Sequence, residues 1–289
     1  MRLLRALAAV GLLSLALGAC AKPVSQNDYA TGPVKAQDAT ITGSARKAPT
    51  SIEQPMPTRL FHPGALAGRT LDVASTADII LRPREVVLTF DDGPRPGRTG
   101  AILDTLDAYG VKATFLMLGA QAEAHPALAR QVALRGHTVG SHTYDHIDLS
   151  KLGRQAALDE IARGEAAVAT ALDGAGGGLS PFFRFPYLAQ TGFLRTSMLQ
   201  GDIVVLDVDI DSKDYYQDTP RTVMDRTLDR LQARGSGIIL FHDIHQRTVE
   251  LLPGFLDELT ARGYKVVALA PRHPGIFGRS VITANAAKQ

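Results

Sequence analysis

Seven short apolar runs, separated by stretches with helical periodicity, constrain the fold of this chain more than any other feature. Between the runs, apolar residues recur three or four positions apart, as Ile102 and Leu106 do, which is typical of amphipathic helices. Strands that alternate with helices in this way indicate a parallel α/β domain. An open doubly wound sheet and an incomplete barrel both fit the pattern. The runs occupy residues 85–90, 112–118, 137–141, 182–185, 203–209, 237–242 and 264–269.

Polar side chains follow several of these runs, at the strand ends where the active sites of parallel α/β folds collect. Asp91 and Asp92 follow the first run, and adjacent residues of an extended chain point in different directions, so the two carboxylates can take two roles. His142 and His146 follow the third run, and imidazoles four residues apart can face one point. Two histidines with one aspartate form a ligand set for Zn²⁺ in hydrolysis or Fe²⁺ in an oxygenase.

Three further clusters follow the later runs. Arg184 lies in an apolar strand, where a positive charge requires an acidic partner, and Asp91 is the candidate. His242 ends the sixth run, level with the other clusters. Close carboxylates repel one another unless a metal ion, arginine or histidine compensates them. The fifth run leads into four such acids, Asp207, Asp209, Asp211 and Asp214. Each cluster also has an ordinary structural interpretation, as a turn, a surface pair, a solvated loop or a core histidine.

The motifs TFDDGP, HxxxH, RFPY, DxDxxDY and LFHD occur in this order between residues 89 and 243, and the match extends from about residue 86 to about residue 269. In content and order they resemble the polysaccharide deacetylase (NodB-homology) family, carbohydrate esterase family four. The resemblance implies an α/β fold that is a distorted, incomplete (β/α) barrel of about seven parallel strands. It also implies metal-dependent hydrolysis of N-acetyl groups from amino-sugar polymers.

The resemblance assigns roles to residues at the matching positions. It implies that Asp92, His142 and His146 hold a divalent metal ion, with zinc expected and cobalt, manganese or nickel as alternatives. Asp91 would be the general base. Arg184 would orient Asp91 and keep its pKa low enough for the carboxylate to be ionised.

The acid side of the site follows from the same resemblance. His242 would be the general acid, and a carboxylate would favour its protonated form. We expect that carboxylate to be Asp214, with Asp211 as the alternative. The backbone N–H of Tyr187 would help to bind the oxyanion. The substrate groove would be lined by Tyr187, Tyr215 and Leu240.

Two motifs depart from the family pattern. The third commonly reads RPPYG, whereas Leu188 stands here in place of the glycine. The fourth usually carries tryptophan after the aspartate, where this chain has Tyr215, and the whole sequence contains no tryptophan. Any surface that stacks on a sugar must therefore be built from tyrosine and phenylalanine. The expected substrate is peptidoglycan or a β-1,4- or β-1,6-linked N-acetylglucosamine polymer. A non-catalytic glycan-binding lipoprotein and a metal amidase for a non-sugar amide are the alternatives.

The first twenty residues have the pattern of a targeting segment. Arg2 and Arg5 precede an apolar run over residues 6–17, which is short for a bilayer span. The run ends in LGAC, which resembles the lipobox of bacterial lipoproteins and implies a lipid on Cys20, the single cysteine. Ala21 follows, a pattern that favours the outer membrane, facing the periplasm. An ordinary secretory signal cut near the same point is the alternative.

These patterns divide the chain into four parts. We expect a signal peptide over residues 1–19 and a tether rich in proline and alanine, with a pre-domain segment, over residues 20–84. The deacetylase domain would span residues 85–270, and a C-terminal tail residues 271–289.

The net charge of the chain is distributed unevenly along it. The formal net charge is +2, but residues 21–84 contain eight Lys and Arg against five Asp and Glu, and the signal segment adds two arginines. Residues 85–289 therefore carry a net charge of −3. Since the basic charge belongs to the leader and tether, we expect a polysaccharide and a membrane as partners and no nucleic acid.

Overall fold

The computed structural model describes residues 65–272. The expected signal peptide with Cys20, most of the tether, and the tail after Arg272 lie outside the described residues. Within residues 65–272, no helix has the length and apolar character needed to cross a membrane.

Every one of the seven apolar runs forms a strand, and two further strands, β1 and β7, join them in one sheet. The strands are β1 (Ala67–Val73), β2 (Glu85–Asp91), β3 (Thr114–Met117), β4 (Thr138–Ser141), β5 (Phe182–Phe183), β6 (Val204–Val205), β7 (Ile210–Asp211), β8 (Gly237–His242) and β9 (Lys265–Pro271). The helices are α1 (Thr99–Ala108), α2 (Gly119–Ala124), α3 (Pro126–Leu134), α4 (Arg154–Ala171), α5 (Gly192–Gln200), α6 (Pro220–Arg234) and α7 (Gln246–Ala261). Three single 3₁₀ turns, η1 (Thr76–Asp78), η2 (Leu149–Lys151) and η3 (Pro186–Leu188), lie in the connections.

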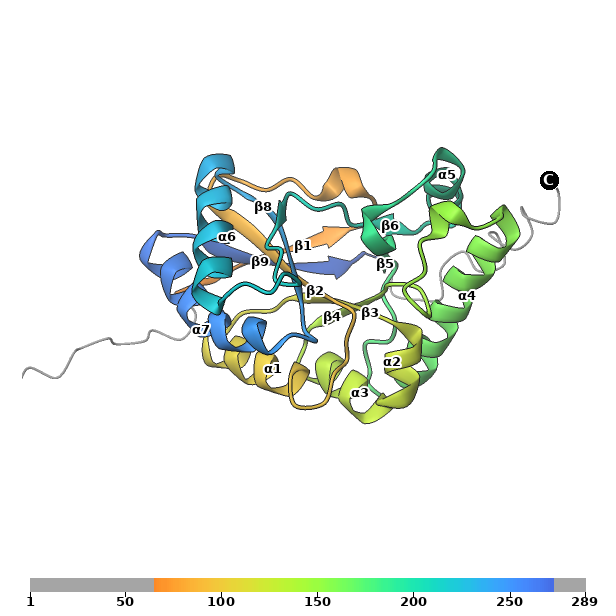
Figure 1. The fold of residues 1–289 in the computed structure, drawn as a ribbon, viewed down its shortest axis with the longest axis horizontal. Coiled ribbons are helices and arrows are strands. Elements are labelled where there is room, and N and C mark those ends of the chain that lie inside the picture. Colours follow the sequence, from red (N-terminus) through yellow and green to blue (C-terminus); the bar gives the residue numbers. More distant parts are fainter. Residues whose placement is uncertain (1–64, 273–289) are drawn as a thin grey trace, which may run out of the picture. The chain divides into compact units, whose positions relative to one another are not determined.

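The sheet is parallel throughout and closes only in part. Its strand order is β1-β9-β2-β3-β4-β5-β6, and β8 pairs with β2 on one side and with β7 on the other. No pairing joins β6 to β7 among residues 65–272, so the barrel is open at that point. Helices lie around the outside of the sheet (Figure 1). This architecture confirms the expected α/β fold with an incomplete barrel.

The first strand comes from the segment that we expected to precede the domain. β1 pairs in parallel with β9, and the two strands lie side by side across the sheet (Figure 1). Leu71 and Val73 of β1 are buried with Val267 and Leu269 of β9 in one cluster. The packed unit therefore begins before residue 85, because β1 supplies apolar side chains to the interior of the barrel.

Alternate residues of each barrel strand face two different cores. On β2, Val86, Leu88 and Phe90 pack in the cluster that contains the helix residues, whereas Val87 packs with β1 and β9. On β8, Ile239 likewise faces the helices. Since side chains of a strand alternate between its two faces, this parity decides which polar residues end up inside the barrel.

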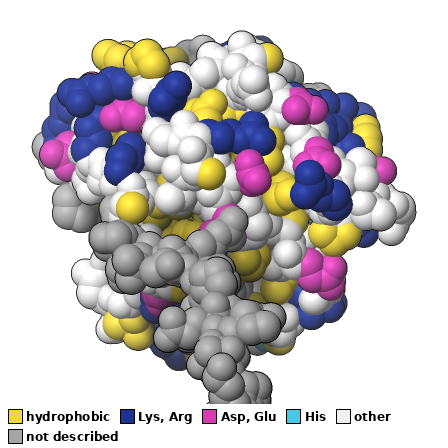
Figure 2. Space-filling view, turned by 90° about the vertical axis from the view of Figure 1, so that its left-hand side faces the viewer, with side chains coloured by type: hydrophobic (Ala, Val, Ile, Leu, Met, Phe, Trp, Pro, Cys, Tyr) yellow, Lys and Arg dark blue, Asp and Glu magenta, His cyan; other side chains and the backbone are white. Residues whose placement is uncertain are grey.

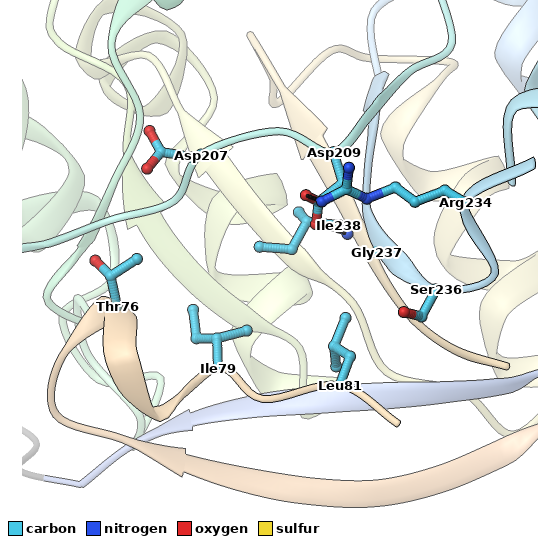
Figure 3. Close-up of a pocket in the computed structure, with 9 residues that line it drawn as sticks. All are labelled: Thr76, Ile79, Leu81, Asp207, Asp209, Arg234, Ser236, Gly237 and Ile238. Carbon is cyan, nitrogen blue, oxygen red and sulfur yellow. Dashed lines mark hydrogen bonds and ion pairs between the residues drawn. The ribbon is translucent and has the colours of Figure 1, made fainter. Parts of the chain in front are cut away.

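A pocket of about 310 Å³ lies near the start of β8, where the barrel is open (Figure 3). Its apolar lining consists of Ile79, Leu81 and Ile238. Asp209 accepts a hydrogen bond from the N–H of Ile238 at 2.9 Å and pairs with Arg234. Asp207 forms two hydrogen bonds of 2.8 Å with Arg195. Two of the four predicted acids thus hold the segment between β6 and β7 in place.

The face over α6 and α7 carries acidic and basic side chains interspersed with apolar ones (Figure 2). Two of its ion pairs lie within or beside α6, between Arg221 and Asp225 and between Arg226 and Asp218. The first of these pairs is exposed and the second is half-buried, and exposed pairs contribute at most about 1 kcal/mol each. The stability of the domain therefore depends mainly on its buried clusters.

Candidate active site

The site lies at the carboxyl ends of the barrel strands, on their inner face. Asp91 has the same parity on β2 as Val87 and Thr89, and His242 has the same parity on β8 as Ile238 and Leu240. The pairing register sets Asp91 opposite His242. The same alternation points Arg184, two residues after Phe182, into the barrel. Strand register thus brings side chains together that are up to 151 positions apart in the sequence.

Asp91 and Arg184 form a buried ion pair. Both side chains are almost fully buried, and Nη1 of Arg184 lies 2.7 Å from Oδ1 of Asp91. The same Nη1 lies 2.8 Å from the hydroxyl of Thr89, and Nε donates to the carbonyl of Leu206 at 3.0 Å. These contacts fix the orientation of the Asp91 carboxylate relative to the pocket.

Burial raises the pKa of the Asp91 carboxyl above its ordinary value, and the charges of Arg184 and His242 offset this only in part. The guanidinium of Arg184 acts in the expected direction, since it lowers the pKa of Asp91, but the effect of removal from water is larger. A carboxylate with a raised pKa is a stronger base than an exposed aspartate. The direction of the shift suits a group that must take up a proton near neutral pH.

Asp92, His142 and His146 form a possible metal-binding triad. Oδ1 of Asp92 lies 3.5 Å from Nε2 of each histidine, and one ligand atom from each residue falls within 4.8 Å of the others. Two atoms bound to one tetrahedral ion at about 2.1 Å lie about 3.4 Å apart. Oδ1 of Asp92 is also buried without a hydrogen-bond partner among the described residues. The donor set and its spacing therefore fit a divalent cation.

His142 is held in the form that a metal ligand requires. Burial lowers the pKa of His142 to about 3, despite the opposing charge of Asp92, so the ring is neutral at physiological pH. Its Nδ1 lies 2.8 Å from the backbone carbonyl of Arg184, which can only accept a hydrogen bond. Nδ1 therefore carries the proton, and Nε2 keeps its lone pair toward Asp92.

His242 is paired with Asp214 rather than with Asp211. Nδ1 of His242 lies 2.7 Å from Oδ1 of Asp214, and Oδ2 accepts hydrogen bonds from the His242 N–H at 2.7 Å and from the Thr248 hydroxyl at 2.6 Å. Burial by itself lowers the pKa of His242, but Asp214, with smaller contributions from Asp92 and Asp91, raises it to about 9. Asp211 instead accepts a hydrogen bond from the Tyr215 hydroxyl at 2.9 Å.

All the predicted site residues lie in or directly behind one pocket of about 440 Å³. Arg184 and Asp214 lie behind it, each hydrogen-bonded to a residue of its wall. The lining contains Asp91, Asp92, His142, His146, Tyr187, Tyr215, Leu240 and His242, together with Phe185, Leu188 and Asp211. Phe185 and Leu188 were not predicted as lining residues, although both lie in or next to the RFPY motif.

The loop after β5 brings exposed apolar side chains to the edge of the pocket in a strained conformation. Tyr187 and Leu188 have φ values of 58° and 57°, in the left-handed region that disfavours residues with a Cβ. The Tyr187 ring packs edge-on against His146, with centroids 4.6 Å apart. Leu188 lies where the family pattern has glycine, so this chain bears a conformational cost that glycine would avoid.

Sequence reasoning missed several residues that support the site. Thr248 binds Asp214 from the start of α7, and no motif marks it. Asp243 is fully buried beside Gly93, and burial raises its pKa to about 7. In the sequence, Asp243 was noted only as the last residue of the LFHD motif and was given no role.

Comparison with known proteins agrees with this geometry. The family model described as polysaccharide deacetylase matches residues 80–202. A probable peptidoglycan-N-acetylglucosamine deacetylase of Arthroderma benhamiae is 40% identical over 192 residues, which cover 64% of this chain and 43% of that protein. A chitin deacetylase of Colletotrichum lindemuthianum is 31% identical over 217 residues, which cover 71% of this chain and 85% of that protein.

A solved structure shares the fold as well. The peptidoglycan deacetylase Bd3279 of Bdellovibrio bacteriovorus superposes with a TM-score of 0.63 at 33% identity, over 73% of this chain and 57% of that chain. The chain spans half or less of the length of several curated relatives that it matches. The agreement of sequence, fold and site geometry shows that the chain belongs to the polysaccharide deacetylase family.

Proposed function

We propose that this protein is a metal-dependent hydrolase that removes N-acetyl groups from an amino-sugar polysaccharide, either peptidoglycan or an N-acetylglucosamine polymer. The observation that carries the proposal is that one pocket combines the metal triad with Asp91, held by Arg184, and His242, held by Asp214. The relatives named as peptidoglycan and chitin deacetylases support the substrate class. We further propose zinc as the ion in the triad.

The residues of the pocket divide the reaction between them. A divalent ion, when bound by Asp92, His142 and His146, supplies polarisation of the acetyl carbonyl and a lowered pKa for a nearby water. Asp91 accepts a proton from the attacking water as the water adds to the carbonyl carbon. The backbone N–H of Tyr187 donates a hydrogen bond to the oxyanion that develops.

Cleavage of the amide then requires a proton on the departing nitrogen. His242 is protonated at neutral pH, because Asp214 raises its pKa to about 9. Nδ1 is held by Asp214, so Nε2–H is the donor to the nitrogen as the carbon–nitrogen bond breaks. Acetate and a free amine on the sugar leave the pocket, and no covalent enzyme intermediate is needed.

Acetate release tests the proposal directly. The purified protein is incubated with peptidoglycan, with chitin oligomers and with β-1,6-linked N-acetylglucosamine oligomers, and acetate is measured enzymatically. We expect release from at least one glycan, loss of release after treatment with EDTA, and recovery on addition of Zn²⁺ or Co²⁺. Undiminished release in EDTA would contradict the metal dependence.

The same assay separates the alternatives. Tight glycan binding without acetate would favour a non-catalytic binding protein. Acetate from a simple aryl acetamide but from no glycan would favour an amidase for non-sugar amides, to which the apolar side chains of Phe185 and Leu188 in the pocket are suited. The ion pair of Asp91 with Arg184 and that of His242 with Asp214 favour catalysis over binding alone. Both pairs hold charged groups in buried positions, which is costly and which a groove that only binds glycan does not need.

We infer from the sequence that the enzyme is held in the cell envelope by a lipid on Cys20, facing the periplasm. A Cys20→Ala variant expressed in a Gram-negative host is expected to move from the membrane fraction to the soluble fraction, as detected by immunoblotting. Because the lipid is attached covalently to the cysteine thiol and alanine cannot carry it, the shift to the soluble fraction should be nearly complete. An unchanged membrane fraction would contradict the anchor.

The pH dependence of turnover reports on His242. Its protonated form is the proton donor, so kcat should fall as pH rises through about 9. In Asp214→Asn the carboxylate is lost while burial still disfavours the charged ring, so the alkaline limb should move to lower pH by two units or more. The variant should therefore lose far more activity at pH 8 than at pH 6.

Asp211→Asn is the matched control for this shift. Asp211 lies in the same segment but binds the Tyr215 hydroxyl, so its loss should leave the position of the alkaline limb unchanged. A limb that stays near pH 9 in Asp214→Asn would contradict the assignment of His242 as the proton donor.

A further inference from the structure

A buried aspartate lies directly beneath the turn that carries the two adjacent carboxylates. Asp243 follows His242 at the end of β8 and is 1% exposed. A Cβ placed on Gly93 would approach the Asp243 carboxylate oxygens to 2.1 and 2.3 Å, so the carboxyl group packs against the bare backbone of Gly93. Glycine at position 93 and aspartate at position 243 are therefore fitted to each other.

Asp243 holds this turn at both of its ends. Its backbone N–H donates to the carbonyl of Asp91 at 3.3 Å. Oδ2 of its carboxyl group accepts a hydrogen bond of 2.5 Å from the hydroxyl of Thr99, the first residue of α1. The same hydroxyl accepts a hydrogen bond from the backbone N–H of Arg95 at 2.7 Å, so Thr99 connects the Asp243 carboxyl group to the far end of the turn. Between the two anchored ends lies Asp92.

Asp92 needs such support because its backbone is strained. Its φ is 75°, in the left-handed region that residues with a Cβ avoid. The N–H of Asp92 donates to the carbonyl of Leu116 at 3.2 Å, and the carbonyl of Gly93 accepts from Leu118 at 3.1 Å. These bonds hold the turn on the β3 side, and Asp243 with Thr99 holds it on the β8 and α1 side. A conformation of this kind persists only where its surroundings fix it from several directions.

We propose that Asp243, acting through the Thr99 hydroxyl and the backbone of Gly93, is a positioning residue that aims Oδ1 of Asp92 at His142 and His146. The inference rests on the metal site of the proposed function, and it concerns the geometry of the protein ligand rather than the chemistry of the ion. Asp243 touches neither histidine in the contacts described, so its effect reaches the site only through the turn. The hydrogen bond and the packing should matter more than the negative charge.

Metal affinity measures this role without reference to turnover. Co²⁺ binding to the purified full-length protein is followed by its visible absorption spectrum, and the Kd is obtained by competition with a chelating dye. We expect Thr99→Val, which replaces the hydroxyl with a methyl group of similar size, to weaken Co²⁺ binding about tenfold and to change the spectrum. Thr99→Ser, which restores a hydroxyl, should return both toward the wild-type values.

Two further variants separate positioning from general stability. Thr114→Val is the matched control, because Thr114 is equally buried and its hydroxyl has no hydrogen-bond partner among residues 65–272. It should bind Co²⁺ as the wild type does. Asp243→Asn keeps the shape and an acceptor for Thr99, so it should stay within a few-fold of the wild-type Kd. Asp243→Ala should weaken binding at least as much as Thr99→Val.

Three results would overturn the inference. One is a Kd for Thr99→Val within twofold of the wild type, even if its melting temperature falls. Another is equal weakening by Asp243→Asn and Asp243→Ala, which would assign the role to charge. The third is failure of the wild-type protein to bind Co²⁺ at all, which would remove the metal site of the proposed function as well. The first two results leave the proposed function intact, so failure of this inference can be distinguished from failure of the proposed function.

Discussion

Replacing Asp91 by asparagine is expected to lower kcat for acetate release by about 10²–10⁴-fold, the range that general base catalysis contributes. Asparagine keeps the size of the side chain but cannot accept a proton from water. Nε2 of His142 and Oδ2 of Asp91 are 3.9 Å apart, so Asp91 borders the triad without being one of its three ligands. Co²⁺ affinity should therefore change much less than kcat. Steady-state kinetics and dye competition on the same preparation check both values.

The interpretation of Asp91→Asn depends on a folded protein, because the variant leaves the Arg184 guanidinium buried without its carboxylate. Activity is therefore compared well below the melting temperature of the variant, with the folded fraction followed by circular dichroism. Asp211→Asn removes another carboxylate of the pocket wall and should reduce kcat far less. A fully folded Asp91→Asn protein with wild-type turnover would remove Asp91 from the mechanism.

The largest effect on stability is expected for Arg184→Met. The substitution leaves the Asp91 carboxylate buried without its partner and takes hydrogen bonds from Thr89 and Leu206. Breaking a buried ion pair from one side costs about 3–5 kcal/mol of unfolding free energy. For a domain of this size that corresponds to a fall of about 6–20 °C in melting temperature. Denaturant unfolding and differential scanning calorimetry measure the two quantities.

The pH dependence of this loss identifies its cause. Burial already raises the pKa of Asp91, and loss of the guanidinium raises it further. An acid whose pKa is higher in the folded state than in the unfolded state destabilises the fold as pH rises above the unfolded value. The penalty in Arg184→Met should therefore be small near pH 4, where Asp91 can hold a proton, and large near pH 8.

The double variant Arg184→Met/Asp91→Asn provides the remaining control. It removes both charges, so part of the lost stability should return although activity does not. A penalty in Arg184→Met that is independent of pH and equal in the double variant would show that lost packing, rather than the unpaired carboxylate, sets the cost.

The strands of the barrel were predictable because they are buried on both faces. Runs such as EVVLTF and GIILFH contain four consecutive or near-consecutive apolar residues and are buried at every position, which is typical of parallel strands covered on both sides. β1 and β7 were not recognised. β1 alternates partly exposed and buried residues as an edge strand does, and β7 has only two residues. The apolar residues of β1 are too sparse, and β7 is too short, for an apolar run to stand out in the sequence.

The polar positions of the site were predictable where they follow a strand, and less so where long-range contacts decide. The sequence favoured Asp214 as the partner of His242 but left Asp211 as an alternative. Asp211 ends the two-residue strand β7, whereas Asp214 lies three residues later in irregular chain, where no strand register fixes its position. The contact of Thr248 with Asp214 depends on where α7 begins relative to β7, which no local pattern reports. The strained φ values at Tyr187 and Leu188 contradict local preference, so only the surrounding packing produces them.

The pairing of β1 with β9 also determines how the domain responds to tension. The strands are parallel and lie next to the two ends of the described chain, so pulling on residues 65 and 272 in opposite directions draws them lengthwise past each other. In this shear geometry all the hydrogen bonds of the pair bear the load together. The buried Leu71, Val73, Val267 and Leu269 must slide through their packing at the same time. We therefore expect separation of β1 from β9 to be the step that limits the unfolding rate of the domain under force.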